Sequence, residues 1–218
     1  HQTSNDLENA FDSHQRDWRG FPRVEFSSME NYFIVQLLGP HRCANDEEFK
    51  RLFGTEEKII NTYVRAAKML EHFGVAAIDI NSICIGENIR KAGGGSGLLD
   101  NQGLAEKILH AMVQAVRIPV AIKFPAGYVP EKRENLESML SVNSVAREKT
   151  LRMVKVAKDA GVAFVIIYPA MFGTSYDERR LDFELLKNAK LVAGKMKLVG
   201  NGCIGSPEKA KKMIEETG

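Results

Sequence analysis

The sequence has 218 residues, of which 44% are hydrophobic and 27% are charged, and this balance predicts one globular domain with a substantial hydrophobic core. A formal net charge of +2 is too small to indicate nucleic-acid binding by charge alone. No apolar run approaches the roughly 18 residues that span a membrane, and we expect no secretory signal. Three cysteines without a Cys-x-x-Cys pair argue against disulfides or structural zinc, so we expect a cytoplasmic protein.

Strand and helix patterns alternate from residue 32 onward. Residues 1–31 are polar and show no clear period, and we expect a surface arm or a short helix there. The apolar run over 32–38 ends at a Gly-Pro pair, which is typical of a buried parallel strand. An apolar face that repeats every three to four residues predicts a helix over 55–73, and a second buried strand follows over 75–80.

The same alternation continues to the last residue. In chain order we predict a helix over 101–116, a strand over 119–124, a charged connection over 126–141, a helix from Asn143 or Ser144 to 160, a strand over 163–168, a loop to 177, a helix over 178–193, a strand over 197–200 and a last helix from Ser206 to 218.

Five strands that each lead into a helix require a parallel sheet, which is either doubly wound or closed into a barrel. The first strand is not followed by Gly-x-Gly-x-x-Gly, and polar residues stand at the carboxyl ends of several strands, which favours the barrel. We therefore predict an α/β fold, a (β/α)8 TIM barrel over residues 32–218. Five of its β/α units are recognisable, and no separate helical domain is expected.

Asn81 and Cys84 stand where the second predicted strand ends, just before a glycine-rich bend over 92–97. A thiol is mostly protonated at neutral pH, so Cys84 at such a site is a candidate general acid. Taken alone, the cysteine fits equally well as a small buried apolar side chain.

Gln36 and Lys123 interrupt two apolar strands. A buried lysine needs a counter-charge or a polar cavity, which the mouth of a barrel provides; the alternative is a lysine whose amine reaches solvent at the strand end. Gln36 offers both a donor and an acceptor to the edge of a heterocycle.

The turn at Asn201 and Gly202 leads into the last helix and resembles a phosphate cradle. The alternative is an ordinary helix start, in which Ser206 caps the helix and Pro207 is its first residue. The five histidines include no His-x-x-x-His pair, and we expect no metal site.

Several segments together resemble the tRNA-dihydrouridine synthases, in the same order along the chain. They are Val35-Gln36-Leu37-Leu38-Gly39, Ile78-Asp79-Ile80-Asn81-x-x-Cys84, Ala92-Gly93-Gly94-Gly95-Ser96-Gly97-Leu98-Leu99, Ile118-Pro119-Val120-Ala121-Ile122-Lys123 and Val199-Gly200-Asn201-Gly202-Cys203-Ile204.

The resemblance implies an FMN-dependent β/α barrel that reduces a uridine of tRNA with NADPH or NADH as the electron donor. It implies that Cys84 protonates the uracil ring while hydride reaches the adjacent carbon. Gln36 and Lys123 match side chains that hold the flavin ring, with Asn81 beside them, and Asn201 and Gly202 match part of the flavin phosphate site.

Four positions depart from the family pattern. Its catalytic motif usually reads Asn-x-Gly-Cys-Pro, and Ile83 and Ile85 replace the Gly and the Pro. Tyr168 stands where a strand usually ends in histidine, and we expect it to contact the flavin, while Pro125 replaces an arginine. Two alternatives follow: a catalytically degenerate barrel that acts as a binding or scaffold protein, and an FMN-dependent reductase of a free pyrimidine, as in the dihydroorotate dehydrogenases.

Overall fold

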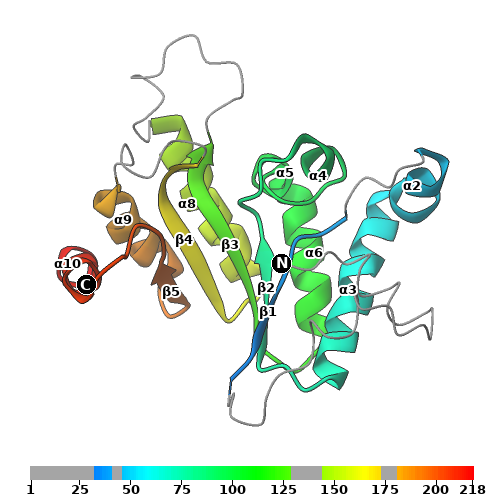
Figure 1. Cartoon of the computed structure of the whole chain (residues 1–218), viewed down its shortest axis with the longest axis horizontal. Coiled ribbons are helices and arrows are strands. Elements are labelled where there is room, and N and C mark those ends of the chain that lie inside the picture. Colours follow the sequence, from blue (N-terminus) through cyan, green and yellow to red (C-terminus); the bar gives the residue numbers. More distant parts are fainter. Residues whose placement is uncertain (1–31, 41–45, 129–143, 173–180) are drawn as a thin grey trace.

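A computed structural model describes residues 32–40, 46–128, 144–172 and 181–218, which form a parallel sheet with a helical layer (Figure 1). The sheet order is β1-β2-β3-β4-β5, and every neighbouring pair is parallel. The strands are β1 (Ile34–Leu37), β2 (Ala77–Asn81), β3 (Val120–Tyr128), β4 (Phe164–Phe172) and β5 (Lys197–Gly200).

Sheet order equals chain order, whereas a doubly wound sheet reverses its order at a switch point. Each connection between neighbouring strands carries at least one helix. The predicted α/β fold is therefore confirmed, and these five strands form part of a TIM-barrel wall.

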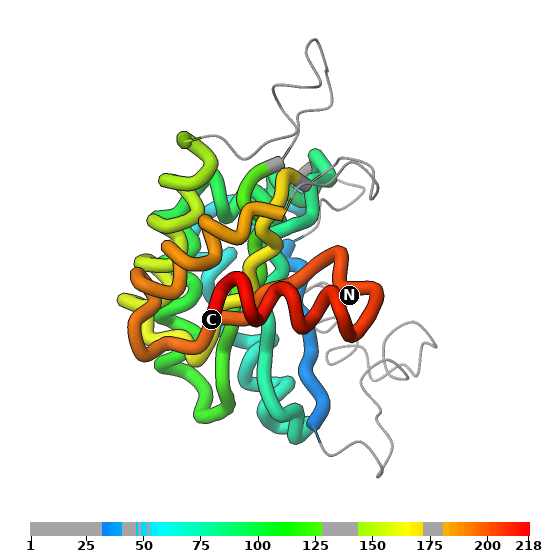
Figure 2. Tube along the Cα trace, turned by 90° about the vertical axis from the view of Figure 1, so that its left-hand side faces the viewer, coloured from blue at the N-terminus to red at the C-terminus, as the bar shows by residue number. Residues whose placement is uncertain are grey.

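The helices cover one face of the sheet, as Figures 1 and 2 show from two directions. They are α2 (Asp46–Phe53), α3 (Glu56–His72), α4 (Glu87–Lys91), α5 (Gly97–Asp100), α6 (Gln102–Ala115), α8 (Ser144–Asp159), α9 (Phe183–Ala193) and α10 (Pro207–Thr217). Alternate strand residues such as Ile78, Ile122 and Val165 join helix side chains such as Leu70 and Met153 in one buried core.

The opposite face of the sheet is the inner face of the barrel wall. Because side chains alternate along a strand, the residues between the core positions point to this face. At β1 and β5 it carries exposed apolar side chains, with Ile34 51% and Val199 45% exposed. In the middle strands it carries Asp79, Asn81 and Lys123.

Two predicted strand ends were wrong. β3 continues past residue 124 to Tyr128 and β4 continues past 168 to Phe172, where we expected a connection and a loop. The two strands stay paired through Pro125 opposite Tyr168, and the register shifts between Pro125 and Gly127. This irregularity lets the ladder pass a residue that has no N–H.

The remaining differences concern helices. α9 begins at Phe183 and not at 178, because Asp182 caps it by accepting a hydrogen bond from the Leu185 N–H at 2.9 Å. The short helices α2, α4 and α5 were not predicted. The expected arm over 1–31 and Asn143 lie outside the described residues.

Candidate active site at the carboxyl ends of the strands

Strand register brings three predicted site residues and Asp79 to one place on the inner face. Gln36 of β1 lies opposite Asp79 of β2, and Asn81 of β2 lies opposite Lys123 of β3. The four residues come from three adjacent strands. Gln36 and Asn81 lie at or near the carboxyl ends of β1 and β2, where β/α barrels hold their chemistry, and Lys123 lies level with Asn81 in the first half of β3.

Three of these side chains form a continuous hydrogen-bonded chain. Gln36 Nε2 donates to Asp79 Oδ2, and Asn81 Nδ2 donates to Gln36 Oε1 at 2.9 Å. Asn81 Oδ1 in turn accepts from the backbone N–H groups of Ile83, at 2.9 Å, and Cys84, at 3.1 Å. The Asn81 side chain therefore closes a tight turn that carries the Cys84 thiol away from the strand end.

The glycine-rich bend packs directly against the cysteine loop. Gly95 has a φ of +50°, and a Cβ at this position would lie 2.5 Å from the carbonyl oxygen of Cys84. The Ser96 N–H donates to that same oxygen at 2.8 Å, and Ser82 Oγ donates to the Gly95 carbonyl at 3.0 Å. A glycine is thus required at 95 for the two loops to meet.

An ion-paired carboxylate ties the bend to the next β/α unit. Asp100, at the end of α5, accepts from Arg90 Nη2 at 3.0 Å and also pairs with Lys149 of α8. Both pairs are partly exposed, so we expect them to orient α4 and α5 more than to stabilise the fold.

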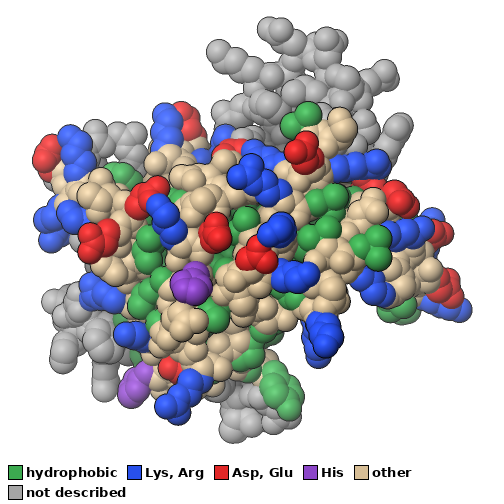
Figure 3. Space-filling view, turned by 180° about the vertical axis from the view of Figure 1, so that it is seen from behind, with side chains coloured by type: hydrophobic (Ala, Val, Ile, Leu, Met, Phe, Trp, Pro, Cys, Tyr) green, Lys and Arg blue, Asp and Glu red, His purple; other side chains and the backbone are tan. Residues whose placement is uncertain are grey.

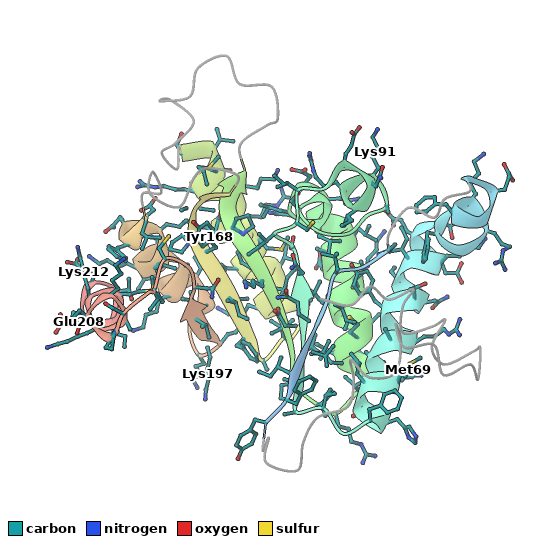
Figure 4. The ribbon with its side chains drawn as sticks, in the orientation of Figure 1. Met69, Lys91, Tyr168, Lys197, Glu208 and Lys212 are labelled. Atoms are coloured by element: carbon teal, nitrogen blue, oxygen red, sulfur yellow. The ribbon has the colours of Figure 1, made fainter. Side chains whose placement is uncertain are left out.

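Ile83 is accommodated by a small apolar cluster of its own. It packs with Tyr168 and Ala170 as three buried residues, with Cys203 at the edge of the cluster. Tyr168 lies midway along β4, and Figure 4 shows it well above Lys197, which is level with the start of β4. The larger side chain at 83, where the family usually has glycine, therefore fills space beside Tyr168.

Asn201 and Gly202 follow β5 at the same end of the sheet. The Asn201 N–H donates to the Ile167 carbonyl at 2.9 Å, and Gly202 packs its backbone on the Tyr168 ring. Ser206 caps α10 by accepting from the Lys209 N–H at 3.4 Å, with Pro207 as its first residue, so the ordinary helix start is present.

Asp79 is the polar site residue to which sequence reasoning gave no role. Only 3% of it is exposed, and its Oδ1 atom has no hydrogen-bond partner. The sequence signal was an acid between two isoleucines of a buried strand, but its partner Gln36 is 43 residues away. Only strand register shows that the two side chains meet.

The described part of the chain also contains a groove of about 720 Å³ between β5 and helices α9 and α10. Its lining includes Leu186, Met213 and Ile214 and none of the predicted site residues. The candidate site is therefore the inner sheet face. Within the described residues, three or more His, Cys, Asp or Glu side chains nowhere gather to bind a metal, and no helix has the length and apolar character to cross a membrane.

Comparison with known sequences identifies the family of the chain. The sequence model of the dihydrouridine synthase (Dus) family matches residues 52–218. The chain belongs to the dihydrouridine synthase family. The match includes β2 to β5 and the loop that carries Cys84, but it begins after Gln36.

Individual relatives extend the comparison. The chain is 30% identical over 167 residues to a probable tRNA-dihydrouridine synthase from Rickettsia bellii. The aligned region covers 77% of this chain and 45% of the relative. It is 29% identical over 154 residues to tRNA-dihydrouridine synthase B from Shewanella oneidensis, covering 71% and 42%. The chain therefore spans less than half the length of these dihydrouridine synthases.

A solved structure supports the fold alone. A 2-naphthoyl-CoA reductase in complex with 2-naphthoyl-CoA superimposes with a TM-score of 0.53 over 80% of this chain and 26% of that one, at 17% identity.

The residues on the inner face fit the flavin that the family implies. Gln36, Asn81 and Lys123 present amide and ammonium groups on one face, as the polar edge of a flavin ring requires. The unpartnered Asp79 Oδ1 shows that this buried face retains hydrogen-bonding capacity. Tyr168 lies in the apolar cluster and not in the hydrogen-bonded chain.

Proposed function

We propose that the protein is an FMN-dependent reductase that saturates the C5–C6 double bond of uridine in tRNA, with NADPH or NADH as the electron donor. The observation that carries this proposal is the Cys84 loop, held by Asn81 beside Gln36 and Lys123 in a dihydrouridine synthase fold. The proposed substrate places the protein in the cytoplasm.

Each site residue has a distinct task in this proposal. FMN, when bound, supplies the hydride. Cys84 Sγ carries the proton that the adjacent uracil carbon receives, and the two additions together balance the reduction of one double bond. Asn81 holds the Cys84 backbone in place.

The remaining residues hold the cofactor. Lys123 would supply a positive charge to the reduced ring, and Gln36 would hold the ring edge. Asn201 and Gly202 would hold the flavin phosphate, and Tyr168 would contact the ring from the β4 side. These roles rest on the position of each residue on the inner face of the sheet or in the turn after β5.

The outer face offers little for tRNA binding by charge. Figure 3, seen from the helical side, shows Lys and Arg side chains interspersed with Asp and Glu. Phosphate binding needs positive charge gathered on one surface. We therefore place the uridine at the inner face, beside Cys84.

Flavin binding is tested by titrating the protein with FMN and following quenching of the flavin fluorescence. Lys123→Gln is expected to weaken FMN binding by about tenfold, because one charge-assisted contact is lost. Lys197→Gln is the matched control, since Lys197 lies on the same sheet but at the opposite strand end. No FMN binding, or an equal loss in both variants, would contradict the proposal and favour a scaffold protein.

Catalysis is tested by measuring dihydrouridine formed in unmodified tRNA. Cys84→Ala is expected to bind FMN normally but to form dihydrouridine at least about a hundredfold more slowly, because the general acid is gone. Cys203→Ala is the control thiol. Turnover of a free pyrimidine without activity on tRNA would overturn the substrate assignment.

A further inference from the structure

Asp79 begins the hydrogen-bonded chain that ends at the Cys84 loop. Its carboxyl is buried, and its Oδ2 atom accepts from Gln36 Nε2. No hydrogen bond joins the Asp79 side chain to the described cysteine loop, so its influence on Cys84 must pass through Gln36 and Asn81.

The direction of every hydrogen bond in the chain is set at Asp79. A side-chain amide has one donor end and one acceptor end. Because the Asp79 oxygen accepts, Gln36 must turn its Nε2 toward Asp79 and its Oε1 toward Asn81. Asn81 then turns its Nδ2 toward Gln36, which leaves its Oδ1 free to accept from the backbone N–H groups at 83 and 84.

The reversed arrangement is unfavourable at its far end. If Gln36 turned its amide over, Asn81 would have to turn as well, and its NH2 group would face the two backbone donors. Two N–H groups of a half-buried loop would lose their acceptor, and a donor would face donors. An acceptor at position 79 therefore selects the loop conformation that is seen.

We propose that Asp79 is a positioning residue that, acting through Gln36 and Asn81, fixes the backbone conformation of the loop carrying the Cys84 thiol. This proposal rests on the proposed function only in that Cys84 is the reactive group of that function. Asp79 itself touches no reacting atom. Its own contribution is the acceptor oxygen, and an amide oxygen at the same place supplies the same acceptor.

The test is the alkylation rate of Cys84 in the full chain, without flavin or tRNA. The protein is treated with iodoacetamide, and mass spectrometry follows the Cys84 and Cys203 peptides in the same sample. Asp79→Leu removes the acceptor and is expected to speed Cys84 alkylation about five- to tenfold, because the loop opens more often. The Cys203 rate is expected to rise much less, because Cys203 lies on a different loop and only at the edge of the cluster that Ile83 joins.

Asp79→Asn is the rescue variant. Its side-chain oxygen still accepts from Gln36, so we expect the wild-type Cys84 rate. If this variant reacts as fast as Asp79→Leu, or if Asp79→Leu reacts like the wild type, the proposal is overturned. Equal acceleration at Cys84 and Cys203 would show general loosening and would overturn it as well.

Gln36→Leu tests the second residue of the hydrogen-bonded chain. It also replaces Asp79→Leu in the experiment if that variant does not fold. Because the two residues act in series, Gln36→Leu is expected to accelerate Cys84 as Asp79→Leu does, and the double variant no further. An unchanged rate in Gln36→Leu, or multiplied effects in the double variant, would contradict the proposal. A protein that binds no FMN still gives a clear result, so failure of the proposed function and failure of this proposal are distinguishable.

Discussion

The buried Asp79 carboxylate lowers the free energy of unfolding of the protein. Burial raises the pKa of its carboxyl to about 6, although the hydrogen bond from Gln36 and the charge of Lys123 both lower it. Above pH about 6 the native protein holds a buried charge that the unfolded chain would leave in water. The folded state therefore loses stability as the pH rises from about 4 to above 6.

Asp79→Asn is expected to stabilise the fold at pH 8 by roughly 2–3 kcal/mol, because it removes the buried charge and keeps the acceptor. The gain should shrink as the pH falls through 6 and disappear below about 4, where the carboxyl of the unfolded chain becomes protonated as well. Urea unfolding of both proteins at pH 8, 6 and 5 measures this. A gap that does not change with pH would contradict the assignment.

Gly202 is the residue on which the turn after β5 depends. Its φ is +100°, and a Cβ would lie 2.0 Å from a ring carbon of Tyr168. Gly202→Ala is expected to lower the free energy of unfolding by at least about 2 kcal/mol through backbone strain and overlap.

Gly205→Ala is the matched control for this turn. A Cβ at 205 would meet nothing within 4 Å, and we expect less than about 0.5 kcal/mol of change. Urea midpoints of the two variants decide the matter, and equal midpoints would show that the Tyr168 contact does not restrict residue 202.

At the scale of elements, α8 is joined to β3 by one buried hydroxyl. Thr150 Oγ1 shares its single hydrogen between the Ala126 carbonyl at 3.1 Å and the Ala146 carbonyl of its own helix at 2.9 Å. Ala126 lies where the register between β3 and β4 shifts, so this hydroxyl bonds to an irregular part of the ladder.

Thr150→Val keeps the shape and removes the donor, and we expect it to destabilise the protein by about 1–2 kcal/mol. Thr62→Val on α3 is the control, because the Thr62 hydroxyl donates only within its own helix, to the Lys58 carbonyl. We expect that change to cost little. Thermal unfolding of both variants compares them, and an equal loss would argue against a role for the Ala126 contact.

The sequence predicts a helix or strand correctly where a pattern of neighbouring residues is enough to determine it. The strands at 32–38, 75–80 and 197–200 are runs of apolar residues bounded by turn residues, and the structure confirms all three. The strands predicted over 119–124 and 163–168 stop just before Pro125 and Pro169, yet β3 and β4 pass through both prolines because their pairing accommodates them. α4 and α5 are too short to show a period.

The site was predictable only in part for a similar reason. Gln36, Lys123 and Cys84 each interrupt a local pattern, so sequence alone singles them out. The role of Asp79 depends on which residue of β1 it faces, and register across two strands is not a local property.

At the scale of the whole molecule, stability is expected to be uneven across the described sheet. β2, β3 and β4 each have neighbours on both sides, whereas β5 pairs with β4 at one end of the sheet order. α10, which follows β5, has Met213 as its single buried residue.

Hydrogen exchange is therefore expected to be slowest in β2 to β4 and markedly faster in β5 and α10, because those last elements open without disturbing the core. Exchange followed residue by residue in the native protein provides the measurement. Equal protection of α10 and β3 would show that the C-terminal unit unfolds only with the whole.

The order of the strands also bears on how the chain is made. Gln36 pairs with Asp79, Asn81 with Lys123 and Lys123 with Ile166, so each strand meets its neighbour about one β/α unit earlier in the chain. A chain leaving the ribosome from its amino end can add one strand and its helix at a time to the sheet already formed. Among these five strands, no sheet contact has to wait for a partner from a distant part of the sequence.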